Sequence, residues 1–171
     1  MTVPAPAPII VTAVIGRDDQ AWLDAQRRAY FPPERNLLPA HLTMFHHLPP
    51  SLADEVRQRL GELAREGTPA ARIAGLISLG RGVAYRIDSA ELEDRRAWLA
   101  DCWADVLTPQ DRAPWRPHVT IQNKVPPKQA RELLARLEQD FRPRPLGIAG
   151  LSVHRYRGGP WETIASYRFR G

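Results

Sequence analysis

Two H-x-T triplets carry the residues of this sequence that are best suited to chemistry. His41 and Thr43 stand in "AHLTMF", and His118 and Thr120 stand in "RPHVTIQNK". Imidazole has an unperturbed pKa of about 6.5, so a histidine pair can supply one base and one acid near neutral pH. Threonine hydroxyls can donate hydrogen bonds to phosphate oxygens, where negative charge develops. The residue types therefore indicate phosphoryl transfer on a phosphodiester, which requires no metal.

The two triplets lie at matched places in an internal repeat. The segment that starts at His41 aligns without a gap over the segment that starts at His118, so that His, Thr and a Pro-Pro pair coincide. Downstream, "IAGL" occurs twice and "AYRI" is answered by "SYRF". We expect one copy over 41–87 and the other over 118–169, each a strand, a helix and two strands, inside a single domain spanning 1–171.

Hydrophobic periodicity predicts the elements that must position these residues. Strands are expected over 9–15, 41–48 and 117–125, in a pair joined at Gly80-Arg81-Gly82, and in a final hairpin turning at Gly158-Gly159. Helices are expected over 18–30, 51–66, 90–107 and 128–141. Asp88 and Glu91 have the spacing of a capping box for the third helix. This alternation favours an α+β fold, and the doubled motif favours two lobes related by a pseudo-twofold axis across a groove.

Strand geometry extends the candidate site beyond the triplets. Alternate residues of a strand share a face, so the His and Thr of each triplet point the same way. The same alternation adds His47 and Lys124 to the groove as substrate-binding candidates, unless a bulge interrupts either strand. His46 has the opposite orientation and is not expected in the site.

Three further side chains are candidates for substrate binding. Arg116 stands just before the second triplet and could bind a flanking phosphate through its planar guanidinium, or be a solvated surface residue. Tyr156 and Trp161 belong to the C-terminal hairpin, where they could stack on a base or pack in the core.

Composition sets the class of partner and the location. The net charge is +5 with a pI near 10.0, which suits a polyanion such as RNA. A metal site formed by His41, His46 and His47 is disfavoured, because adjacent strand residues diverge and no acidic residue lies close in sequence. The single Cys102 excludes an intramolecular disulfide. The Pro-rich N-terminus lacks the pattern of a signal peptide, and no apolar run could span a membrane, so we expect a cytoplasmic location.

The two motifs resemble the paired H-x-T signatures of the 2H phosphoesterase superfamily, which includes bacterial 2′-5′ RNA ligase-like proteins and cyclic phosphodiesterases. The resemblance covers nearly the whole chain. It implies antiparallel sheets with outer helices around the groove, and action on 2′,3′-cyclic phosphates and related 2′-5′ linkages without a cofactor. It also implies His41 and His118 as catalytic residues, and Thr43 and Thr120 on the phosphate. The run "FHHLPP" departs from the small-residue, Phe-Leu-Gly type run of many members, which bears on substrate preference.

These observations lead us to expect a monomeric, metal-independent phosphodiesterase that opens 2′,3′-cyclic phosphates of RNA ends or nucleotides. The reverse reaction, a 2′-5′ RNA ligation, would use the same groups. One alternative is a module that binds RNA ends with little or no catalysis, although such a module would not need both histidines. Another alternative is an esterase for a different small cyclic phosphate.

Overall fold

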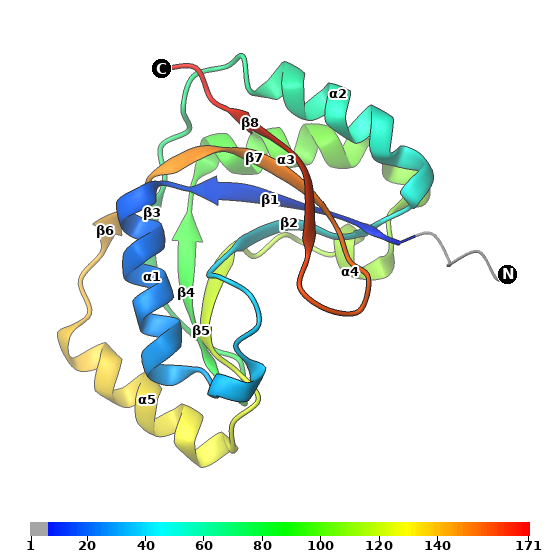
Figure 1. The fold of residues 1–171 in the computed structure, drawn as a ribbon. Helices are drawn as coiled ribbons and strands as arrows, with labels where there is room; N and C mark the ends of the chain where they lie inside the picture. The colour runs from blue at the N-terminus through cyan, green and yellow to red at the C-terminus, as the bar shows by residue number, and fades with distance from the viewer. Residues whose placement is uncertain (1–6) are drawn as a thin grey trace, which may run out of the picture.

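Two four-stranded antiparallel sheets form the framework of the computed structural model, which describes residues 7–171 (Figure 1). The first sheet has the order β2 (Leu42–Leu48), β1 (Ile9–Ile15), β7 (Ile148–Arg155) and β8 (Glu162–Arg168). The second sheet has the order β5 (His118–Gln122), β4 (Val83–Asp88), β3 (Arg72–Ser78) and β6 (Arg144–Pro145). The expected bilobed α+β fold is therefore confirmed. The Pro-rich start of the chain, residues 1–6, lies outside the described residues.

Helices connect and cover the sheets. The α-helices are α1 (Arg17–Tyr30), α2 (Ala53–Leu63), α3 (Ala90–Cys102), α4 (Pro109–Arg112) and α5 (Pro127–Asp140). Three short 3-10 helices are η1 (Pro33–Arg35), η2 (Pro50–Leu52) and η3 (Ala104–Val106). Among these, α2 packs on β7, α5 packs on β3, and α1 packs on β5. No helix in the described part of the chain is both long and apolar enough to cross a membrane.

The helix termini differ in detail from the expected ones. The N-cap of α3 is Ser89, whose hydroxyl accepts a hydrogen bond from the Leu92 amide. The capping box expected from Asp88 and Glu91 is therefore wrong by one position, because Asp88 still belongs to β4. The helix also ends at Cys102 instead of 107.

The repeat copies do not coincide with the two sheets. The motif strand β2 of the first copy joins β7 and β8 of the second copy, through β1. Conversely, the motif strand β5 of the second copy joins β4 and β3 of the first copy. In addition, β8 occupies a sheet edge, whereas β4, its counterpart in the sequence alignment, is an inner strand. Each lobe therefore contains strands from both halves of the chain.

A single buried cluster joins the sheets. It contains side chains of the first sheet, such as Val11 and Leu151, together with side chains of the second sheet, such as Ile73 and Val119. This shared core fixes the two sheets relative to each other, which the candidate site requires because its residues come from both.

Candidate functional site

The two H-x-T segments meet where the sheets approach each other. Both β2 and β5 are edge strands of their sheets, and they contact each other (Figure 1). In both segments the residues that alternate with His and Thr are fully buried; they are Leu42, Met44, Val119 and Ile121. The His and Thr side chains are partly exposed on the opposite face. The structure thus gives each pair one shared face, as the alternation predicts.

Both imidazoles are held in the same way by the backbone. Nδ1 of His41 lies 2.9 Å from the Pro39 carbonyl oxygen, and Nδ1 of His118 lies 2.7 Å from the Arg116 carbonyl oxygen. A carbonyl only accepts, so Nδ1 must carry the hydrogen in both rings. In the neutral form, Nε2 is then the ring atom with a free lone pair. Each histidine therefore offers Nε2 for proton transfer.

Side chains of helix α1 form hydrogen bonds with the backbone of both motif segments. The amide of Ala40, next to His41, donates to the Asp24 carboxylate at 2.7 Å, and its carbonyl accepts from Gln20 at 2.8 Å. One helical turn later, Nη1 of Arg27 donates to the Thr120 carbonyl oxygen at 3.0 Å. Burial lowers the pKa of Arg27, while the nearby Asp24 charge raises it. Gln20, Asp24 and Arg27 thus tie the two sheets together at the site.

The first threonine segment has an equivalent tether. Nε1 of Trp115 donates to the Thr43 carbonyl oxygen at 3.0 Å, the same distance that joins Arg27 to Thr120. Trp115 stands just before the second triplet, so the second motif supports the first one directly. Both threonines therefore have their backbone fixed by a side chain from another segment.

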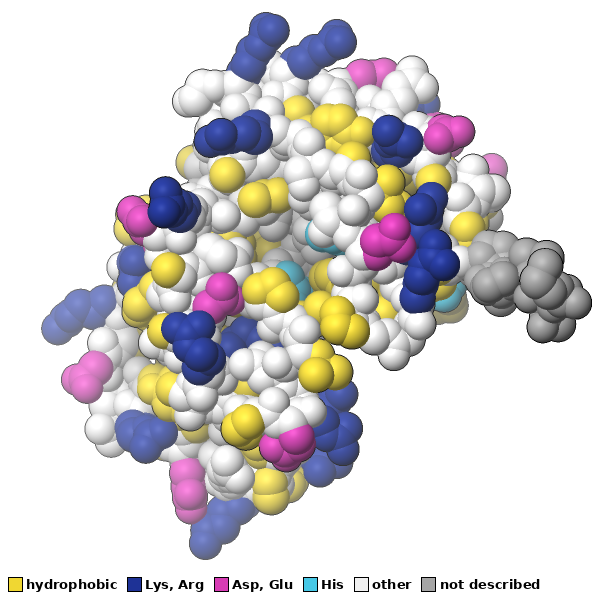
Figure 2. All heavy atoms as spheres, viewed as in Figure 1, with side chains coloured by type: hydrophobic (Ala, Val, Ile, Leu, Met, Phe, Trp, Pro, Cys, Tyr) yellow, Lys and Arg dark blue, Asp and Glu magenta, His cyan; other side chains and the backbone are white. Residues whose placement is uncertain are grey.

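A groove cavity of about 290 Å³ opens beside these strands. Five of the sequence-predicted site residues line it: His41, Thr120, Lys124, Tyr156 and Trp161. Figure 2 shows histidine side chains in the hollow near the middle of the molecular face. Thr43 and His118 do not line this cavity. His118 nevertheless lies close enough for its charge to lower the pKa of His41.

The groove cavity also contains cations that the sequence pattern does not reveal. Arg27 and Arg35 line it together with Lys124 and Asn123. Lys124 adopts a positive φ of 62°, and its amide donates to the Asn123 side chain at 2.8 Å. The cavity therefore combines positive charge with the hydroxyl and imidazole groups, as a phosphate site would require.

Trp161 and His41 line both this groove cavity and a smaller one of about 160 Å³, the His154 cavity. The Trp161 ring lies 4.7 Å from the His41 ring and 5.5 Å from the His154 ring, measured between centroids. His154 is held by two hydroxyls, with Nε2 2.9 Å from Thr12 and Nδ1 2.9 Å from Thr163. Burial lowers the pKa of His154, which favours its neutral form. A third histidine thus stands beside the first.

Burial also gives His41 a distinct electrostatic state. It lowers the pKa of His41 to about 4, although the hydrogen bond to the Pro39 carbonyl opposes the shift. The positive charge of Arg27 and of the neighbouring histidines lowers the pKa further. His41 is consequently neutral at pH 7, with its lone pair on Nε2.

The structure does not bring His47 into the groove cavity, which corrects the extrapolated alternation. The pairing of β1 with β2 is irregular at two places, and Met44 and Phe45 are both buried. These bulges leave His46 and His47 exposed side by side. Their amides donate to the two carboxylate oxygens of the fully buried Asp111, at 2.9 and 3.0 Å. This part of the strand anchors α4 instead of contacting the groove cavity.

Arg116 contributes to the site through its backbone. Its carbonyl oxygen orients His118, while its side chain is exposed and lines neither of the two cavities. Over residues 7–171, no three His, Cys, Asp or Glu side chains are grouped so that they could hold a metal ion.

Comparison with known proteins identifies a matching family model. The family model described as "2'-5' RNA ligase superfamily" matches residues 16–160. A search of curated proteins found no match.

Several solved structures share the fold. LigT of E. coli complexed with 3'-AMP has 13% sequence identity and a TM-score of 0.63, with 98% of this chain and 100% of that chain covered. LigT complexed with NADP+ gives 14% identity and a TM-score of 0.60, covering 96% and 99%. TT0787 of Thermus thermophilus gives 17% identity and a TM-score of 0.59, covering 96% and 98%.

Proposed function

Because this chain belongs to the 2′-5′ RNA ligase superfamily, whose members act on phosphodiester bonds, we propose that it hydrolyses 2′,3′-cyclic phosphates of RNA ends or nucleotides. One observation carries the proposal: both motif histidines direct Nδ1 to a carbonyl oxygen two residues earlier and leave Nε2 free. Two equivalent imidazoles on opposing strands are what in-line attack on phosphorus requires, with one base and one acid.

The lowered pKa of His41 supports the role of base for His41 and of acid for His118. His41 is neutral at pH 7, so its Nε2 takes a proton from water as the water oxygen bonds to phosphorus. The bond from phosphorus to the ribose 3′ oxygen breaks on the opposite side. Protonated His118 gives its Nε2 proton to that departing oxygen, and the product is a 2′-phosphate. A 5′-hydroxyl that attacks phosphorus in place of water, with the same P–O3′ bond breaking, would give a 2′-5′ linkage.

The remaining site residues bind the substrate. Thr43 and Thr120 donate their hydroxyl hydrogens to the non-bridging oxygens as charge builds up. Lys124 adds a positive charge at the cavity wall, while Tyr156 and Trp161 offer ring faces to a base. Arg116 binds a flanking phosphate through its exposed guanidinium. This reaction needs no metal or cofactor, and we expect the chain to act as a monomer.

Single substitutions of the histidines test the proposal. His41→Ala and His118→Ala should each lower kcat by roughly 10²–10⁴-fold, because each removes one proton-transfer group. The measurement is turnover of a panel of 2′,3′-cyclic nucleotides in the presence of EDTA, with the product isomer assigned by phosphorus NMR.

The matched control is His47→Ala, on the same strand but with an exposed side chain outside the groove cavity. It should retain wild-type kcat. Full activity in either His41→Ala or His118→Ala would refute the proposal. RNA-end binding that survives loss of both histidines, with no turnover by the wild type, would instead identify a binding module.

A further inference from the structure

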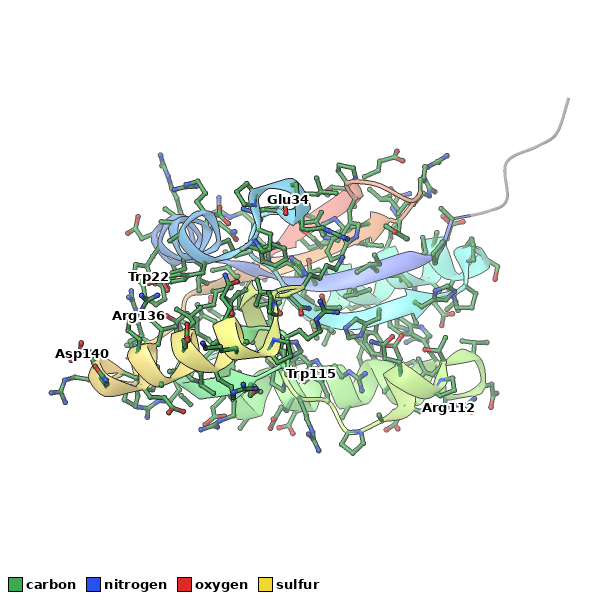
Figure 3. The ribbon with its side chains drawn as sticks, turned by 90° about the horizontal axis from the view of Figure 1, so that it is seen from below. Trp22, Glu34, Arg112, Trp115, Arg136 and Asp140 are labelled. Atoms are coloured by element: carbon green, nitrogen blue, oxygen red, sulfur yellow. The ribbon has the colours of Figure 1, made fainter. Side chains whose placement is uncertain are left out.

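A second large cavity lies outside the groove, between α1 and α5 and over strands β3 and β4. We call it the outer cavity; its volume is about 440 Å³. Small-molecule sites typically measure roughly 300–1,000 Å³, so it can hold a ligand of nucleotide size. Figure 3 shows Trp22 on α1 and Arg136 on α5 at neighbouring positions of the two helices. Its principal lining side chains are four aromatic residues and three arginines: Trp22, Tyr30, Tyr85, Phe141, Arg136, Arg142 and Arg144.

Helix α1 separates the outer cavity from the groove cavity. Trp22, Gln26 and Tyr30 follow one another at four-residue spacing, and all three line the outer cavity. Arg27 and Phe31, which are displaced by one residue, line the groove cavity instead. The two cavities therefore lie on different sides of the C-terminal end of α1, where Tyr30 and Phe31 are consecutive.

The aromatic walls of the outer cavity are fixed before any ligand binds. The Trp22 and Tyr85 ring centroids are 5.4 Å apart, and those of Tyr85 and Phe141 are 6.4 Å apart. The Tyr85 hydroxyl donates to Gln26 at 2.9 Å, and burial raises the pKa of Tyr85 to about 12. Arg144 lies 4.3 Å above the Trp22 ring and is paired with Asp19 at 3.1 Å. A rigid wall of this kind loses little entropy when a flat ring binds to it.

The rim of the outer cavity carries positive charge without neutralising partners. Arg136 and Arg142 are exposed, and neither has a carboxylate within ion-pair distance among the described residues. Arg136 lies 5.8 Å from the centroid of the Tyr30 ring. Asp140 is the one carboxylate that lines the cavity among residues 7–171. Guanidinium groups beside ring faces match a phosphate joined to a planar base.

We propose that the outer cavity binds a base and its adjoining phosphate from single-stranded RNA whose 2′,3′-cyclic end occupies the groove. This inference rests on the proposed function. It makes the substrate of that function more specific, namely RNA instead of a mononucleotide. An α-helix with its side chains is about 10 Å across, so a mononucleotide in the groove cannot also reach the far side of α1. Aromatic faces favour a base over an acidic peptide, which would use the arginines alone.

A double charge reversal tests the outer cavity. Arg136→Glu/Arg142→Glu replaces two exposed residues, so the fold should be kept. KM for a single-stranded oligoribonucleotide ending in a 2′,3′-cyclic phosphate should rise by about tenfold or more, with kcat unchanged. The dependence of log KM on log salt should become weaker by roughly 0.7 for every phosphate that the variant no longer binds. Turnover of a 2′,3′-cyclic mononucleotide should not change.

The matched control is Arg57→Glu/Arg65→Glu, which makes the same charge change at two exposed positions. Arg57 lies in α2, and Arg65 follows the end of that helix. It should leave the KM for the oligonucleotide near the wild-type value. An equal rise in both double variants would indicate a general charge effect and overturn the proposal. An unchanged KM for the oligonucleotide in the Arg136→Glu/Arg142→Glu variant would also overturn the proposal.

Direct binding separates this inference from the proposed function. Fluorescence anisotropy of the labelled oligonucleotide with wild type and the Arg136→Glu/Arg142→Glu variant reports on the outer cavity even if no turnover occurs. Weaker binding of RNA in this variant alone supports the proposal. Binding of a labelled polyglutamate peptide that is lost in the variant, with RNA affinity unchanged, would assign the cavity to an acidic protein segment instead.

Discussion

At the scale of single residues, the two motifs are alike in more than their sequence. Each histidine is oriented by the carbonyl two positions before it, and each threonine has its carbonyl held by a side chain from another segment. The electrostatic surroundings of the pair differ, however. The Trp161 ring packs edge-on against the His41 ring and is also in contact with the His154 ring. The pseudo-twofold arrangement thus places the two histidines in equivalent positions. The C-terminal hairpin makes their surroundings different, because Trp161 contacts only His41 of the two.

This inequality predicts the acidic limb of the pH profile. A base must be neutral to act, and burial lowers the pKa of His41 to about 4. The kcat/KM for a cyclic nucleotide should therefore rise through about pH 4 and level off above it, instead of rising near the pKa of about 6.5 of an ordinary histidine. Trp161→Ala should open His41 to water and move this limb upward toward the ordinary value. The measurement is the pH dependence of kcat/KM for both proteins.

Tyr156→Ala supplies the control for this pH experiment. It removes another aromatic side chain next to the same hairpin turn, one that is 44% exposed and does not stack on His41. Its acidic limb should stay near pH 4, whatever happens to KM. A limb near 6.5 in the wild-type enzyme would contradict the action of His41 as a base with a lowered pKa.

At this scale, the repeat determines what could be predicted from sequence. Residues common to both copies stand out, and these were the His and Thr pairs. His154 aligns with a leucine of the first copy, and Arg27 lies outside both copies, so the same comparison passes over them. The prediction for His47 is wrong for a different reason. Strand alternation holds only until a bulge, and at this bulge the His46 and His47 amides donate hydrogen bonds to the distant Asp111.

At the scale of elements, a buried carboxylate shapes the motif strand. Asp111 in α4 accepts both bulge amides of β2 and also lies 3.3 Å from Nδ1 of His46. Burial alone would raise the pKa of Asp111, but these hydrogen bonds and the His46 charge hold it below its usual range. The ionised carboxylate therefore stabilises the fold above its ordinary pKa of 3.8, and this stabilisation is lost as the pH falls through the lowered value.

Asp111→Ala should accordingly lower the free energy of unfolding by about 3 kcal/mol, because it leaves two backbone donors without an acceptor at roughly 1–3 kcal/mol each. Urea unfolding at pH 7 measures the change. The control Asp105→Ala removes an exposed carboxylate nearby and should stay within about 0.5 kcal/mol of the wild type. Equal effects of the two substitutions would contradict the role of Asp111.

Most elements were predictable because their local signals are strong. The amphipathic pattern predicted α1 and α5, and the β-branched run 9–15 predicted β1 with its observed bounds. The short α4 was not predicted, since a single turn carries too few residues for a periodic signal. The residues of η3 were expected to continue the third helix, and the structure places them in a separate short turn. The two-residue strand β6 likewise depends on pairing with β3, a contact that sequence alone does not reveal.

At the scale of the whole molecule, the exchange of strands between repeat copies makes the lobes interdependent. The first half of the chain contributes β1 and β2 to one sheet and β3 and β4 to the other, and the second half completes both sheets. The sequence predicted two lobes because the motif occurs twice. It did not predict which strands pair across the copies, since that depends on contacts between distant segments.

Cutting the chain within the exposed segment 112–114 tests this interdependence. Neither fragment 1–113 nor fragment 114–171 should show cooperative thermal unfolding alone, because each lacks strands for both sheets. When the two fragments are mixed in equal amounts, they should associate and regain a cooperative thermal unfolding transition. Circular dichroism measures this transition. Cooperative unfolding of fragment 1–113 by itself would show that the first half of the chain folds independently, which would contradict the interdependence of the lobes.

The position of Trp161 has a consequence for synthesis of the protein. The ribosome makes both histidine segments well before it makes the hairpin that covers His41, and the first sheet closes only when β7 and β8 arrive. Pairing between such distant segments forms slowly, after the local helices. The surroundings of His41 are therefore among the last features to appear, and a nascent chain holds both histidines of the proposed site before that site is complete.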